Sequence, residues 1–345
     1  MIHTIRTAGH LSSALSYFAW TGVASIANVL SKEPVTMYWS SEAQSVGIVE
    51  TSDVSLEKIA LEIIHLATRW SEGWTGEIVD YSKGSFSPFS PRFKAINPDA
   101  DSQDWINHQN ARTQWLDHLE EVDDELARRL IHGLGEAAYW RFDGREPRPD
   151  HGASRWEMKT RNRGEEFIKN RFHPLCREIS TWSVDELQDS LQGNKVSDTL
   201  NKNSTDSRTS TGLTPPGQAD SALAFTALLG IGNFPITHRI HAMSVTPGAH
   251  PYSVLHPSWV ILPIPTVPIS SERFENIMLT AEWAAVVDAI GTNHGAPFVG
   301  DHFLAPARTT LKQWGIPAAS VHRIHKGGTS SAPERYFEFG TVVLL

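Results

Sequence analysis

Apolar residues recur every three or four positions in two stretches near the N-terminus, which predicts amphipathic helices over residues 11–29 and 55–70. Short runs at 2–6, 34–39 and 46–51 instead alternate or cluster apolar residues as strands do. The start of the chain therefore predicts the order β-α-β-β-α. This order builds a small sheet with helices on one face.

The same periodicities predict further elements along the chain. The predicted helices cover 104–132, 167–182, 222–232, 272–290 and 306–314. Pro174 falls inside the second of these, so we expect a kink or two short helices there. Residues 259–269 alternate prolines with aliphatics, which predicts an edge strand or an extended segment and argues against a central strand.

The end of the chain predicts a hairpin. Residues 319–325 and 335–345 are strand-like, and Gly327–Gly328 lies between them as a turn. We expect the last strand to pair inside a sheet and to hold the C-terminus in place.

Together these elements predict an α+β fold with four parts. The parts are an N-terminal α+β domain (1–135), a basic and mainly helical segment (136–191), a mobile loop or linker (192–219) and a C-terminal α+β domain (220–345) ending in the hairpin. Residues 192–219 predict a loop because they are dense in Asn, Ser, Thr, Asp and Pro and nearly devoid of large apolar side chains.

Composition places the chain among ordinary globular proteins, since 40% of its 345 residues are hydrophobic and 20% are charged. A single cysteine, Cys176, excludes an internal disulfide and fits a reducing compartment, so we expect a cytoplasmic protein. No apolar run approaches the roughly 20 residues that span a bilayer, and we expect no membrane partner. The net charge of -9 argues against nucleic-acid affinity over the whole surface.

One stretch of this acidic chain is locally basic. Residues 155–177 interleave lysines and arginines with Trp156, Phe167 and Phe172, and Gly164 predicts a turn that leads into a helix. Guanidinium groups, aromatic faces and a helix N-terminus suit a surface that follows phosphates, although a solvated helix face has the same pattern. The candidate nucleic-acid contacts here are Arg155, Lys159, Arg161, Asn162, Arg163, Lys169 and Arg171.

A second candidate surface is the loop 73–97, which is rich in Gly, Ser, Pro and aromatic residues. Its Lys83, Arg92 and Lys94 could hold phosphates while its rings stack on bases. The alternative is an ordered loop whose rings anchor it in the core.

Motifs for catalysis are weak. Pro149-Asp150 followed by Glu157-x-Lys159 resembles the PD-(D/E)-x-K signature of metal-dependent nucleases, in which two carboxylates hold Mg²⁺. The sequence H-R-I-H occurs at His238–His241 and at His322–His325, but on a strand such a pair points to opposite faces, so we expect no metal site. No phosphate-binding loop or dinucleotide fingerprint is present, and we expect no cofactor.

Several segments carry a resemblance to a known family. They are Tyr17–Ile26 (Y-F-A-W-T-G-V-A-S-I), a strand ending at Trp39, Ala222–Ile231 (A-L-A-F-T-A-L-L-G-I) and Gly327–Arg335 (G-G-T-S-S-A-P-E-R). This layout resembles the CRISPR-associated large-subunit-like proteins of type I-U systems, also called I-G.

The resemblance implies a non-catalytic subunit of an RNA-guided surveillance complex, with other effector subunits, guide RNA and target DNA as partners. In such a complex a large subunit senses the short motif beside the target, holds displaced DNA and helps to recruit the nuclease, while guide pairing reads the sequence. Two other functions stay open from the residues alone: the Mg²⁺-dependent nuclease on Asp150, Glu157 and Lys159, and an adaptor that bridges proteins.

Overall fold

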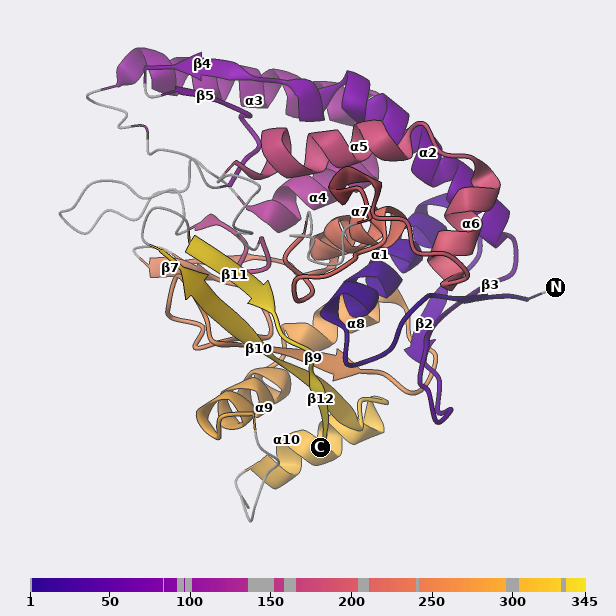
Figure 1. Cartoon of the computed structure of the whole chain (residues 1–345). Helices are drawn as coiled ribbons and strands as arrows, with labels where there is room; N and C mark the ends of the chain where they lie inside the picture. Colours follow the sequence, from indigo (N-terminus) through magenta and orange to yellow (C-terminus); the bar gives the residue numbers. More distant parts are fainter. Residues whose placement is uncertain are drawn as a thin grey trace.

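The structure is a computed structural model of the whole chain (Figure 1). It describes residues 2–82, 84–91, 96, 101–135, 152–157, 166–203, 211–239, 242–295, 304–329 and 333–345. Within these parts helices and small sheets are combined, which confirms the predicted α+β class.

The N-terminal part forms a three-stranded antiparallel sheet in the order β1-β3-β2, with two helices. Its elements are β1 (His3–Arg6), α1 (Ala14–Leu30), β2 (Thr36–Trp39), β3 (Gly47–Thr51) and α2 (Leu56–Glu72). Both helices begin at serine N-caps, because the Ser13 side chain accepts from the Ser16 amide and the Ser55 side chain from the Lys58 amide. The predicted order β-α-β-β-α is confirmed.

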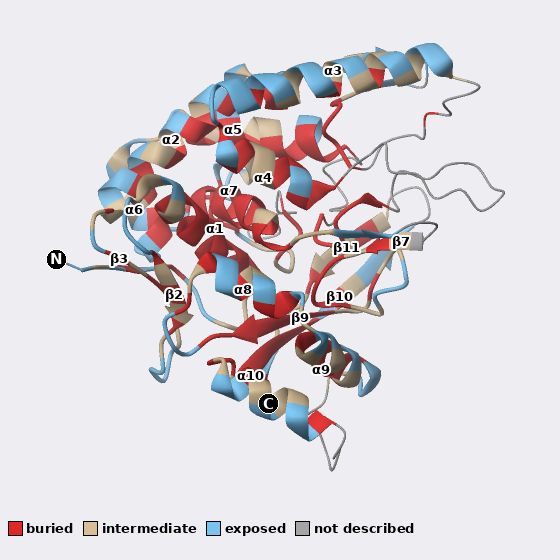
Figure 2. Ribbon diagram, turned by 180° about the vertical axis from the view of Figure 1, so that it is seen from behind, coloured by how far each residue is buried: buried red, intermediate tan, exposed pale blue. Residues whose placement is uncertain are grey.

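The centre of the molecule is a pair of apolar helices, α1 and α7 (Ser221–Gly230). Every residue of α7 is buried, and α1 is buried from Ala14 to Ala27 (Figure 2). The two backbones approach closely at glycines. A Cβ on Gly22 would lie 1.9 Å from the Thr226 carbonyl oxygen, and one on Gly230 would lie 2.0 Å from the Phe18 carbonyl oxygen.

Helices cover one side of this central pair, and the C-terminal sheet lies on the other (Figure 1, Figure 2). The elements of the helical side are η1 (Trp74–Gly76), β4 (Val79–Tyr81), β5 (Gly84–Phe86), α3 (Ser102–Glu121), α4 (Glu125–Leu134), the π-helix η3 (Ile168–Phe172), α5 (His173–Ile179), α6 (Val184–Gln192), η4 (Thr199–Asn201) and η5 (Ile231–Asn233), which follows α7. Most of the buried apolar residues form one cluster that extends from Ile5 to Leu345, so the N-terminal and C-terminal parts share a core.

Two long helices of the sequence prediction are each divided in the structure. The helix predicted over 104–132 breaks between α3 and α4, where Asp123 has φ +52° and the Asp124 side chain caps α4. The helix predicted over 272–290 breaks between α8 (Ser271–Met278) and α9 (Ala281–Thr292), where the Thr280 side chain caps α9. The capping side chains compete with continuation of the helix, and the apolar period does not register this competition.

Two short helices, η3 and α5, meet near Pro174 as expected, but the proline itself is not at the boundary between them. It lies in the first turn of α5, directly after the π-turn of η3, so the helical path continues. The His173 amide bonds to the Ile168 carbonyl in the π pattern, which adjusts the backbone just before the residue that has no amide proton.

The C-terminal sheet has the strand order β11-β10-β9-β8, and β12 also pairs with β10. The elements of this part are β6 (Thr237–Arg239), β7 (Ala242–Val245), β8 (Ala249–His250), β9 (Trp259–Ile264), α10 (Ala305–Gln313), β10 (Ala318–Gly328), β11 (Pro333–Phe337) and β12 (Thr341–Leu344), besides α8 and α9. The predicted hairpin is present as β10–β11, but Gly327–Gly328 is not its turn. Both glycines lie inside β10, opposite Glu334 and Pro333, and the predicted last strand is divided into β11 and β12. The C-terminus is held in place, because the Leu345 amide bonds to the Pro317 carbonyl.

Strand β9 corrects the prediction for 259–269, since it lies between β10 and β8 rather than at an edge. Its pairing with β8 covers Trp259 and Val260, whereas Pro263 pairs with Ala319 of β10 beyond the end of β8. Because β8 has only two residues and does not extend to Pro263, it needs no hydrogen bond from the amide that proline lacks. The proline is therefore compatible with a central strand.

The segment 192–219 is packed only in part, because residues 192–196 are exposed whereas residues 211–213 are buried. Ser197, Asp198, Thr211 and Leu213 are buried, and the Asp220 carboxylate accepts from the Ser197 amide at 2.8 Å. Internal hydrogen bonds here replace apolar burial, which a composition argument does not detect. Residues 204–210 lie outside the described residues.

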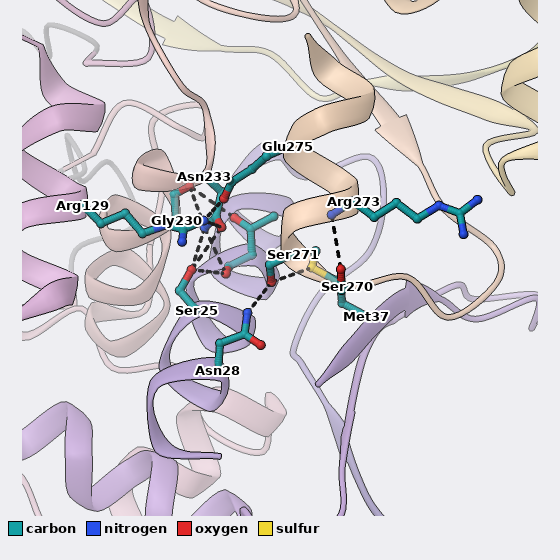
Figure 3. A network of polar contacts seen from close by, with 11 residues as sticks. Ser25, Asn28, Met37, Arg129, Gly230, Asn233, Ser270, Ser271, Arg273 and Glu275 are labelled. Atoms are coloured by element: carbon teal, nitrogen blue, oxygen red, sulfur yellow. Dashed lines mark hydrogen bonds and ion pairs between the residues drawn. The ribbon is translucent and has the colours of Figure 1, made fainter. Parts of the chain in front are cut away.

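A network of polar contacts joins α1, α4, η5 and α8 (Figure 3). The Asn233 side-chain amide donates to the Thr21 carbonyl at 3.2 Å and to the Ser25 hydroxyl at 2.7 Å. Its carbonyl oxygen accepts from Arg129 at 3.0 Å, and Arg129 also pairs with Glu275. The network links four elements that are distant in sequence, since the Asn233 side chain alone bonds to residues of α1 and α4.

Candidate nucleic-acid interface

The structure describes three of the sequence-predicted contact residues. Lys83, Arg92, Lys94, Lys159, Arg161, Asn162 and Arg163 lie outside the described residues. Lys169 is exposed, and its ammonium group lies 3.5 Å from the Ser85 carbonyl oxygen, so β5 and η3 meet near it.

Arg155 and Arg171 are buried, which corrects the expectation that they belong to an exposed basic surface. Arg155 is 1% exposed and donates to the carbonyl oxygens of Ala153 at 2.7 Å and Ser244 at 3.3 Å. Arg171 is ion-paired with Glu157, and both side chains are fully buried. The interior holds these guanidinium groups because carbonyl or carboxylate acceptors offset the cost of removing them from water.

The same ion pair bears on the nuclease hypothesis. Glu157 would have to exchange Arg171 for a metal ion, while Asp150 and Lys159 lie outside the described residues. In the described parts of the chain, no group of three or more His, Cys, Asp or Glu is placed to hold a metal ion.

The second H-R-I-H motif lies on β10 and behaves as a strand predicts. His322 points into the core and His325 to the other face. The His322 ring contacts the Ser320 hydroxyl at 2.8 Å and the Glu338 carbonyl at 3.1 Å, and burial lowers its pKa to about 4. His322 is therefore neutral at physiological pH.

A different basic surface occupies the C-terminal sheet. It is a cleft of about 780 Å³ between the sheet and the end of α9. Its lining residues are Ser258, Trp259, His294, Arg323, Ile324, His325, Lys326 and Glu338. We call this cleft, together with Tyr336 of β11, which stacks on His325, the basic–aromatic cleft.

Strand register places the aromatic and cationic side chains of the cleft together. Arg323 lies directly opposite Trp259, and His325 lies opposite Tyr336. Residues at these alternate positions share one face of the sheet. The rings of His325 and Tyr336 are stacked, with centroids 4.4 Å apart and planes 14° apart.

The position of Trp259 depends on a glycine. Gly295 has φ +79°, and a Cβ there would lie 2.9 Å from the Trp259 ring. The chain that follows α9 therefore lies against the indole, and its close approach needs a residue without a side chain.

The next cross-strand pair joins two cations, Lys326 of β10 and Arg335 of β11, and lies on the opposite face of the sheet from the His325–Tyr336 pair. The Lys326 ammonium donates to the His256 carbonyl at 2.7 Å and to the Ser258 hydroxyl at 3.1 Å. Burial, and secondly the neighbouring Arg335 guanidinium, lower the pKa of Lys326. Glu338 supplies a carboxylate to the cleft, 3.7 Å from the His325 ring.

The sequence contains a signal for this cleft that was missed when residues 319–345 were interpreted only as a hairpin and a possible metal motif. From Arg323 to Lys326 the chain places cationic or titratable side chains at three of four positions of one strand, and Arg335 and Tyr336 follow in the partner strand. Trp259 comes from far away in the sequence, and only the register brings it to Arg323.

Searches against protein-family models and against curated proteins found no match for this chain. Among the described residues, no helix has both the length and the apolar character needed to cross a membrane.

Proposed function

We propose that this chain is a non-catalytic nucleic-acid-binding subunit of a type I CRISPR RNA-guided effector complex. Its partners would be the other effector subunits, the guide RNA and the target DNA, in the cytoplasm. The observation that supports nucleic-acid binding is the basic–aromatic cleft, in which Arg323 and Lys326 line one hollow with Trp259. The assignment to this class of complex rests on the resemblance of the sequence segments.

The chemistry of the cleft suits a sugar-phosphate chain. Arginine and lysine attract phosphates, and aromatic faces stack on bases without regard to sequence. A net charge of -9 repels nucleic acid elsewhere on average, so the cleft would localise contact to one place. Basic partner subunits would then supply the remaining phosphate contacts.

In this role the chain would position the nucleic acid and would not catalyse a reaction. Guide pairing would read the target sequence, while the cleft would hold backbone and support target recognition. No bond-breaking step is assigned to its residues.

The test compares two charge reversals of the same kind. Arg323→Glu changes the cleft, and Lys312→Glu changes an exposed lysine on α10 as a matched control. Each variant is co-expressed with the proteins encoded beside it, and the purified complex is titrated with target DNA across a salt series. We expect Arg323→Glu to weaken binding and to lower the salt slope by about one, with the complex still assembled.

Equal affinities and parallel salt slopes for the wild type and both variants would contradict the proposal. Assembly of the complex without any contribution of this subunit to nucleic-acid affinity would favour the adaptor. Mg²⁺-dependent cleavage by the wild type that is lost in a folded Glu157→Gln variant would favour the nuclease.

A further inference from the structure

We propose that a pocket between residues 245–252 and the junction of α8 and α9 binds a small amine, which is a protonated amino group on an apolar and preferably aromatic body. The pocket has a volume of about 410 Å³ and shares no lining residue with the basic–aromatic cleft. Small-molecule sites in proteins have volumes of about 300 to 1,000 Å³. The proposal does not depend on the proposed function.

The walls of this pocket are largely apolar. Met278 of α8 and both Trp283 and Val287 of α9 line it and are buried, whereas Leu279 between the two helices and Tyr252 after β8 are 52% and 50% exposed. A ligand with an apolar body that lies against these side chains removes its own apolar surface and theirs from water. The walls therefore favour an apolar body for the ligand.

His250 and Asp288 supply a polar pair to the same pocket. The His250 Nδ1 atom is buried without a hydrogen-bond partner in the described parts of the chain, and it lies 3.7 Å from the Asp288 Oδ1 atom, which is too long for a hydrogen bond. With its proton on Nε2, the ring presents Nδ1 as an acceptor. A donor nitrogen at about 2.9 Å from each of the two atoms would then bridge them.

The two members of this pair are held in place by β8 and α9. The Ser258 amide donates to the His250 carbonyl at 2.8 Å, and β8 pairs His250 with Trp259. Gly291 lies against the His250 ring, since a Cβ there would be 2.1 Å from it. Asp288 is three residues before Gly291 on the same face of α9, so one helix carries the carboxylate and supports the ring. A ring that is already held loses little entropy when a ligand binds.

The charge of the pair selects a cationic head group. Burial lowers the pKa of His250 against the opposing effect of Asp288, so the ring is neutral near pH 7 and does not neutralise the carboxylate. In the described part of the chain, no lysine or arginine forms an ion pair with Asp288. Arg239 also lines the pocket, but it is exposed and already interacts with another residue. An ammonium group has donors for both acceptors and a charge opposite to that of Asp288, whereas an anionic head group would be repelled.

The experiment titrates the full chain with phenethylamine, phenethyl alcohol and phenylacetate, which carry a positive, a neutral and a negative head group on the same ring. Binding is followed by ligand-observed NMR and by calorimetry. Asp288→Asn removes the charge of a carboxylate that is 65% exposed, His250→Phe keeps a flat ring without Nδ1, and Ala284→Trp places an indole in the pocket from an exposed position. Asp117→Asn is the matched control, because it removes an exposed carboxylate on α3, far from α9 (Figure 1).

We expect phenethylamine to bind the wild type and the Asp117→Asn control alike. Asp288→Asn and His250→Phe should each weaken this binding about three- to tenfold, and phenethyl alcohol should bind the wild type more weakly by a similar factor. Ala284→Trp should abolish binding of the amine. Thermal unfolding confirms that each variant is folded, and the exposed position of Asp288 allows Asp288→Asn to decide the question even where the His250 variant does not fold.

Equal binding of phenethylamine to the wild type and to Asp288→Asn would overturn the proposal. So would binding of phenethyl alcohol or phenylacetate as tight as that of the amine, or the failure of all three probes to bind. Binding of the amine retained in a folded Ala284→Trp variant would place the amine outside this pocket and would also overturn the proposal. No nucleic acid takes part in these titrations, so their failure is distinct from a failure of the proposed function.

Discussion

The glycine contact between α1 and α7 gives the sharpest stability prediction. Gly22→Ala adds a Cβ that would lie 1.9 Å from the Thr226 carbonyl oxygen, and real Cβ contacts essentially never fall below 3.0 Å. The obstacle is helical backbone, which cannot rotate away as a side chain would. The two helices must therefore separate by about 1 Å where every neighbouring residue of α7 is buried.

The magnitude follows from two opposing terms. Overpacking of a close-packed interior costs about 3 kcal/mol at its upper typical value. Replacing glycine by alanine inside a helix returns about 1 kcal/mol. The expected net loss is about 2 kcal/mol in the free energy of unfolding. With an unfolding entropy of about 2.1 cal/mol/K per residue, a loss of this size lowers the melting temperature of a chain of 345 residues by about 3 °C.

The assay is thermal and urea unfolding followed by circular dichroism. Gly76→Ala is the control, because its Cβ would meet its nearest atom, in the His173 ring, at 3.4 Å. Gly230→Ala should behave like Gly22→Ala, and the double variant should lose less than the sum because both widen the same gap. A Gly22→Ala variant as stable as the Gly76→Ala control would refute the close approach of α1 and α7.

Three further predictions concern buried polar groups. Burial lowers the pKa of His322 from 6.5 to about 4, so the unfolded chain binds a proton at this residue at a higher pH than the folded chain does. As the pH falls from 6.5 towards 4, the wild type should therefore lose about 3 kcal/mol more of its unfolding free energy than His322→Gln loses. Urea unfolding at a series of pH values measures this difference. Arg171→Ala removes the ion-pair partner of the buried Glu157 carboxylate and should cost about 3 to 5 kcal/mol. Lys169→Ala, at an exposed position, should change the unfolding free energy by less than about 0.5 kcal/mol, and equal effects would contradict the burial. Asp220→Ala removes the acceptor of the Ser197 amide, so hydrogen exchange at Ser197 should be slow in the wild type and much faster in the variant.

The parts of this fold that the sequence determined are those governed by local interactions. The apolar periods of residues 11–29, 55–70 and 222–232 were sufficient to place α1, α2 and α7. Helix propensity, capping and side-chain periodicity act within a few residues, so they can be recognised in the amino-acid sequence.

The tertiary structure decided which charged groups are exposed. The basic stretch 155–177 supplies two arginines to the interior, because Glu157 and the carbonyls of Ala153 and Ser244 are there to receive them. Composition also could not show that parts of 192–219 are buried, since the partners that satisfy the polar groups there include Asp220 at the start of α7.

The candidate site itself depends on strand register. Trp259 and Arg323 become neighbours because β9 and β10 pair antiparallel, and Lys326 meets Arg335 because β10 and β11 do. A shift of one residue in either pairing would move these side chains to the opposite face of the sheet. Sequence patterns fix which residues alternate along a strand, and only the pairing of distant strands decides which side chains meet.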